Sequence, residues 1–126
     1  GQGAVSEETA RAMARGARSL LGRHDFSSFE TSGAERKDSI RTVDELPVER
    51  GRGGGQDWIT LEVEADGFLY NMVRAIVGTL VEVGRAARDE SWVAEVLAAK
   101  DRRAAGPTAP PQGLFLVRVD YGEIGD

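Results

Sequence analysis

The segment that most constrains the fold of this chain is 67–84, which reads GFLYNMVRAIVGTLVEVG. Its apolar residues cover most of a helical circumference, which is typical of a helix buried in a core. A polar stripe recurs at steps of three and four residues and therefore lies on one side of the helix: Asn71, Arg74, Gly78 and Glu82, with Tyr70 one turn before Arg74. An unpaired buried charge is costly, so Arg74 needs a partner. Either Arg74 forms a structural ion pair, for example with Glu82, or the stripe lines a cleft where Arg74 holds an anion.

The composition predicts one globular domain over residues 1–126, because 40% of the residues are hydrophobic and 29% are charged. No apolar run approaches membrane-spanning length, and the N-terminus lacks the pattern of a signal peptide. The chain contains no cysteine, which excludes disulfides and thiolate metal sites and indicates a reduced, cytoplasmic protein. It begins with Gly1 rather than methionine, which indicates either a cleaved chain or a piece of something longer.

The charges are unevenly distributed along the chain. The formal net charge of −5 argues against a general nucleic-acid-coating protein. No acidic residue lies between Thr9 and His24, however, and this segment holds four arginines: Arg11, Arg15, Arg18 and Arg23. It therefore predicts a locally basic face, which either binds nucleic acid or is an ordinary solvated helix surface.

Hydrophobic periodicity predicts an α+β fold in which helices pack on one face of an antiparallel sheet, in the order α-β-β-α-α-β. The predicted elements are a helix over about 7–21, an outer strand over 38–48, a strand over 58–65, the helix that follows Gly67, a shorter helix capped by Ser91, and a strand over 114–121. The last strand is apolar on both faces, which is typical of a central strand. The glycine-rich stretch 51–55 is predicted to be a flexible hairpin connection and not a phosphate-binding loop.

The segment 22–29, GRHDFSSF, lies outside the periodic elements. Phe26 and Phe29 are expected to fill the core beneath a loop. His24 is the only histidine, and no serine or cysteine nucleophile is identifiable beside it. We expect a structural hydrogen-bonding role for His24 rather than acid–base chemistry.

Three segments in order resemble one family. They are 22–29, then 67–84, then 105–116, in which AGPTAP precedes GLFL. Their sequences resemble the C-terminal half of tRNA pseudouridine synthase A, and the resemblance covers the chain from about Met13 to Tyr121.

The resemblance implies an isomerisation of uridine to pseudouridine in the tRNA anticodon stem-loop, without metal or other cofactor. It implies a cytoplasmic homodimer that flips the target nucleotide out of its stem. It also implies that Arg74 pairs with the catalytic aspartate, that Leu114 and Leu116 form a wall beside the uracil, and that Thr108 lies on the cleft rim. Tyr70 and Asn71 are further substrate-binding candidates, and the RNA-binding candidates are Arg11, Arg15, Arg18 and Arg23.

The sequence departs from the family in one large respect. The family's catalytic aspartate belongs to the N-terminal half, in an Arg-Thr-Asp context that this chain lacks. Arg41-Thr42-Val43-Asp44 resembles it only superficially, on an expected outer strand. The chain alone is therefore expected to be inactive. The alternative hypotheses are a stand-alone, non-catalytic RNA-binding module and a dimerisation domain.

Overall fold

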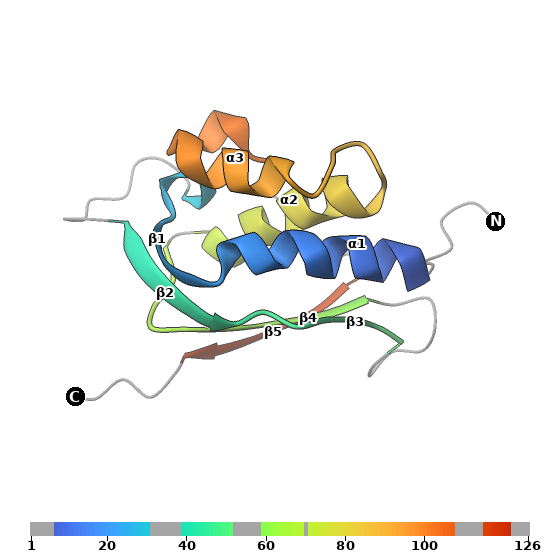
Figure 1. Cartoon of the computed structure of the whole chain (residues 1–126). Helices are drawn as coiled ribbons and strands as arrows, with labels where there is room; N and C mark the ends of the chain where they lie inside the picture. Colours follow the sequence, from blue (N-terminus) through green and yellow to red (C-terminus); the bar gives the residue numbers. More distant parts are fainter. Residues whose placement is uncertain (1–6, 31–38, 52–58, 70, 108–114, 122–126) are drawn as a thin grey trace.

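The computed structural model describes residues 7–30, 39–51, 59–69, 71–107 and, for the backbone, 115–121. Its helices and strands are α1 (Glu7–Ala17), β1 (Gly22–Asp25), β2 (Ile40–Glu45), β3 (Val48–Arg50), β4 (Ile59–Ala65), α2 (Met72–Gly84), α3 (Trp92–Ala99) and β5 (Phe115–Tyr121). Short 3₁₀ helices occupy Arg18–Leu20, Ser27–Phe29 and Arg102–Ala104. All three α-helices lie on one face of the sheet (Figure 1). The predicted α+β class is confirmed.

Strand β4 is the centre of the sheet. Along one edge it pairs antiparallel with β2 and β3, where Val43 faces Ala65 and Val48 faces Leu61. The register shifts between Val43 and Glu45, so β2 and β3 together follow one bent edge of β4. The predicted outer strand is therefore divided in two, and β1 covers the far side of β2.

Strand β5 pairs with the opposite edge of β4 in parallel, from Ile59 and Phe115 to Ala65 and Tyr121. Helices α2 and α3 form the crossover that a parallel pair requires. The predicted antiparallel sheet is thus confirmed for β1 to β4 but not for β5. Among the described residues β5 pairs with β4 alone, so it lies at an edge although its two apolar faces predict a central strand.

Strand β1 is the element that periodicity did not predict. Its residues are polar and half-buried or exposed, so they carry no alternating signal. Two contacts anchor the segment that follows: the Ser27 backbone N–H and hydroxyl both donate to Asp25, and they lower the pKa of that carboxyl below its ordinary value. His24 Nε2 lies 2.6 Å from the Leu21 carbonyl oxygen, which agrees with the predicted structural role.

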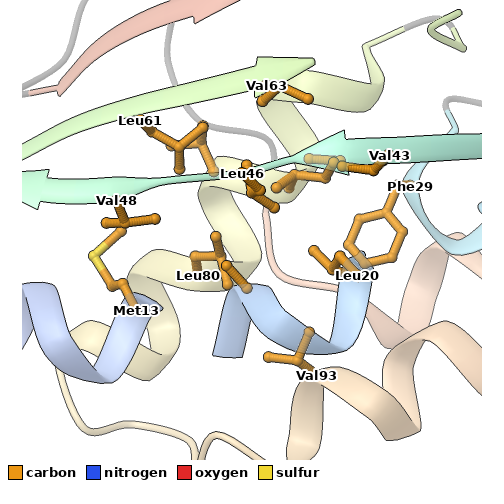
Figure 2. Packing of buried hydrophobic residues seen from close by; sticks show 14 of the residues in the cluster. Met13, Leu20, Phe29, Val43, Leu46, Val48, Leu61, Val63, Leu80 and Val93 are labelled. Carbon is orange, nitrogen blue, oxygen red and sulfur yellow. The ribbon is translucent and has the colours of Figure 1, made fainter. Parts of the chain in front are cut away.

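The core lies between the helices and the inner face of the sheet, as Figure 2 shows. Ile59, Leu61, Val63 and Ala65 of β4 are fully buried, as their alternation predicts. Phe26 and Phe29 are also fully buried, which confirms that they fill the core. No helix within the described ranges is long and apolar enough to cross a bilayer.

Candidate functional site

The polar stripe of the central helix begins at a residue with unusual backbone geometry. Asn71 precedes the first residue of α2 and has φ 60° and ψ 16°, in the left-handed region. Asparagine visits this region more readily than most residues because its short polar side chain can hydrogen-bond locally. Such strained residues cluster at functional sites. Ala86 and Lys100 share this left-handed backbone, so the geometry alone does not distinguish Asn71, which the sequence placed among the substrate-binding candidates.

Arg74 lies one turn into α2 and is half-buried, whereas Met72, Ala75 and Ile76 around it are fully buried. The structural partner considered for it is otherwise engaged: the Glu82 carboxylate lies 3.3 Å from the guanidinium of Arg85. Eight residues of helix also separate Arg74 and Glu82 by about 12 Å along the axis. Arg74 and Glu82 therefore lie toward opposite ends of the stripe, both half-buried, and Glu82 belongs to a separate ion pair.

The middle of the stripe is covered by the chain at Gly106. A methyl group at Gly106 would lie 2.8 Å from the carbonyl oxygen of Gly78 and 3.0 Å from the Cα atom of Thr79. Only glycine allows so close an approach of two backbones. The Gly106 backbone N–H donates to Thr79 Oγ1 at 3.0 Å, and this contact is buried. Gly106 is thereby fixed on α2 one turn beyond Arg74.

Hydrogen bonds join the three segments that carry the family resemblance. The buried Ser28 hydroxyl, in 22–29, donates to the Val96 carbonyl at 2.6 Å and accepts from the Asp101 backbone N–H at 2.8 Å. The next residue, Arg102, donates from Nη1 to the Gly106 carbonyl at 2.9 Å. Gly106 then bonds to Thr79, within 67–84. We call this set of contacts, from Ser28 through Asp101, Arg102 and Gly106 to Thr79, the loop anchor.

Three of the predicted substrate-binding residues, Tyr70, Thr108 and Leu114, lie outside the described residues. Leu116 lies on β5, and its backbone stands in register with Thr60 of β4. The roles assigned to these four residues stay predictions. Asp44 is exposed on β2, on the outer strand where the sequence placed it.

Only part of the predicted basic face has arginines that are exposed and could contact RNA. Arg11, Arg18 and Arg23 are exposed. Arg15 bridges two carboxylates, at 2.5 Å to Glu90 and 2.9 Å to Glu8, and these hydrogen bonds raise the pKa of Arg15 above its ordinary value. The positive charge of Arg15 is therefore balanced within the protein.

Two hollows adjoin α1. One, of about 730 Å³, is lined by Arg15 and other residues of α1, by Val83 of α2 and by residues 86–91, which connect α2 to α3. The other, of about 350 Å³, is lined by Arg11 and Arg50 among residues of α1 and β3. Neither hollow includes Arg74 or Asn71. Within the described part of the chain, no three His, Asp or Glu side chains gather as metal ligands would.

Sequence reasoning missed Thr79 and Arg102. A single threonine in an apolar helix gives no sign of a specific contact. Arg102 belongs to a run of charged residues that is typical of a helix end. Two signals were available, namely Gly78 beside Thr79 and the Gly106-Pro107 pair, since a glycine inside a helix often marks a close packing contact.

Comparison with known proteins gives one consistent result. A family model described as tRNA pseudouridine synthase matches residues 17–122. The tRNA pseudouridine synthase A of Myxococcus xanthus is 51% identical over 110 residues, which are 87% of this chain and 40% of that protein. The proteins of the same name from Thermoanaerobacter pseudethanolicus and Acidiphilium cryptum are each 50% identical, over 86% and 89% of this chain and 43% and 42% of their own length. The chain thus spans about two fifths of the curated relatives it matches.

Proposed function

Because this chain belongs to the tRNA pseudouridine synthase family, we propose that it forms the C-terminal half of an enzyme that isomerises uridine to pseudouridine in the tRNA anticodon stem-loop. The observation that carries this proposal is the match over 86–89% of the chain to only 40–43% of each relative. Among the described residues, one edge of β5 has no partner strand, which is consistent with an N-terminal half of the protein that packs beside it. The relatives' names do not favour a non-catalytic module or a dimerisation domain.

In this reaction the carbon–nitrogen bond between uracil and ribose breaks and the base rejoins the ribose through a carbon atom. No atoms are gained or lost overall, so the reaction needs no external oxidant or reductant. We propose that the nucleophile is an aspartate of the N-terminal half. Arg74 would be the cation that pairs with this aspartate. Burial would raise the pKa of such an aspartate, and a neighbouring guanidinium opposes this shift and favours the ionised form. The enzyme would act as a cytoplasmic homodimer.

The proposed function is tested by comparing the 126-residue chain with the intact protein that carries it. We expect the intact protein to form pseudouridine in a tRNA transcript, and the chain alone to form none because the nucleophile is missing. The measurement is single-turnover modification at equal protein concentration. Turnover by the chain alone would refute the half-enzyme proposal, and an inactive intact protein would refute the activity itself.

The RNA-binding part of the proposal is assigned to the exposed arginines Arg11, Arg18 and Arg23. Contacts to phosphates release counterions, so affinity falls as salt rises. We expect the double variant Arg11→Ala, Arg18→Ala to bind tRNA more weakly, and to reduce the slope of log affinity against log salt by about 1 for each arginine. The measurement is a salt titration of tRNA binding by the intact protein.

Arg15→Ala is the matched control for this titration, since Arg15 lies between Arg11 and Arg18 along the chain, on α1 with Arg11, and carries the same charge. Its guanidinium already bonds Glu8 and Glu90, so its removal should change the slope less than removal of either exposed arginine. Equal slopes for the double variant and the wild type would place the RNA-binding surface elsewhere.

A further inference from the structure

We infer that Thr79 is a positioning residue for the reaction, because it fixes the chain at Gly106 and Pro107 one helical turn beyond Arg74. The inference rests on the proposed function and concerns the same site. Thr79 is fully buried, and its hydroxyl oxygen accepts the Gly106 N–H at 3.0 Å. It is the point where the loop anchor meets α2.

The geometry of the contact leaves the Gly106 peptide little freedom. Thr79 accepts from the Gly106 N–H, and Arg102 Nη1 donates to the Gly106 carbonyl oxygen at 2.9 Å. The Gly78 backbone limits the approach of Gly106 on a third side, where even a methyl group would lie 2.8 Å from an oxygen atom. Two contacts with α2 and one with Arg102 therefore set the position of Gly106.

The placement of Gly106 matters because Gly106 packs against α2 close to Arg74. Gly78 follows Arg74 by four residues, so both lie on the same face of α2 and about 6 Å apart along its axis. A displacement at Gly106 would therefore move Gly106 and Pro107 relative to the part of α2 that carries Arg74. A shift of about 1 Å in a catalytic constellation costs on the order of a hundredfold in rate.

Thr79→Val removes the acceptor oxygen while keeping the shape of the side chain, and Thr79→Ser keeps the oxygen. In the intact protein we expect Thr79→Val to lower kcat by about tenfold to a hundredfold, with a smaller change in KM, and Thr79→Ser to retain most of kcat. We also expect faster hydrogen exchange at the Gly106 amide in the valine variant and slow exchange in the serine variant. The exchange measurement reports on the contact without requiring activity.

The control variant Val93→Ala separates the effect of a general loss of stability from the effect of losing the Thr79 contact. Val93 is fully buried against α1 at Gly16, outside the loop anchor, so its truncation weakens the core without touching Gly106. We expect this variant to unfold at lower temperature and to keep wild-type kcat at a temperature where it is folded.

Three results would overturn the inference. They are a wild-type kcat in Thr79→Val, unchanged Gly106 exchange in that variant, and an equal loss of kcat in folded Val93→Ala. An intact wild-type protein without pseudouridine formation would instead refute the proposed function, and the catalytic role of Thr79 with it. Activity in the wild type together with undiminished activity in Thr79→Val would refute the positioning role alone.

Discussion

Replacement of Arg74 by alanine in the intact protein is expected to abolish measurable pseudouridine formation. An aspartate nucleophile must stay ionised and correctly aimed, although burial alone favours its neutral form. The guanidinium favours the ionised form and can hold the carboxylate through two parallel hydrogen bonds. Arg74 lies in the first turn of α2 and is half-buried. The measurement is single-turnover modification of tRNA.

Arg74→Lys separates charge from geometry, because lysine keeps the positive charge but lacks the planar fork. We expect a reduced but measurable rate for this variant. In both Arg74 variants the free energy of unfolding should fall by less than the about 3–5 kcal/mol that is typical of breaking a fully buried ion pair, because water can reach a half-buried site.

The matched control is Arg85→Ala. Arg85 follows the last turn of α2, is exposed and pairs with Glu82, so its loss should leave the rate near that of the wild type. A near-normal rate for Arg74→Ala would show that Arg74 is only a structural partner. A loss in Arg85→Ala as large as in Arg74→Ala would show that the effect is not specific to the position of Arg74.

Gly106→Ala is expected to give the second large effect, on stability and activity together. The added methyl group would lie 2.8 Å from the Gly78 carbonyl oxygen and 3.0 Å from the Thr79 Cα atom, and both atoms belong to the backbone of a buried helix. A helix backbone cannot rotate aside, so the loop anchor must move. We expect the free energy of unfolding to fall by about 1–3 kcal/mol, as for other overpacked sites. Urea unfolding and the tRNA modification rate measure the two effects.

Gly84→Ala is the control for this variant. A methyl group there would be equally close, at 2.8 Å, but to Cγ of the Met13 side chain. Methionine has three rotatable bonds and adapts to irregular space, and alanine suits a helix better than glycine does. We expect a smaller loss of stability and a normal modification rate. Equal losses of stability and of modification rate in both variants would show that the close backbone contact at Gly106 has no special role.

Elements whose residues carry one clear period were predictable. The apolar stripe of α1, the alternation in β4 and the apolar circumference of α2 each give local evidence of element type and of the buried face. Strand β1 was missed because its polar residues do not alternate. The parallel direction of β5 was missed because it depends on the path of α2 and α3, which periodicity does not record. The edge position of β5 among the described residues was missed because apolar residues on both faces record burial and not the number of neighbouring strands.

The candidate site was predictable to the extent that it follows one helix. The spacing of Asn71 and Arg74 predicts that they share one face of a helix, but α2 begins at Met72, so Asn71 precedes the helix and only Arg74 lies on it. The left-handed backbone of Asn71 leaves no mark in the sequence beyond the choice of asparagine. The pairing of Arg15 with Glu90 joins α1 to the residues before α3, and the contact of Thr79 with Gly106 joins α2 to the residues after α3. Both are non-local contacts, which depend on the assembled fold.

The parallel pairing of β5 with β4 also has a consequence for the order of folding. Strands β1 to β4 follow closely along the chain, whereas Phe115 meets Ile59 only after α2 and α3 have folded back across the sheet. The entropy of closing so long a loop is lost before any contact compensates for it, so such a pair forms slowly. During synthesis from the N-terminus, one edge of β4 therefore keeps unpaired N–H and C=O groups until the last strand arrives, and an exposed edge of this kind pairs readily with other chains. The nascent chain is thus most prone to aggregation in the interval between completion of α3 and docking of β5.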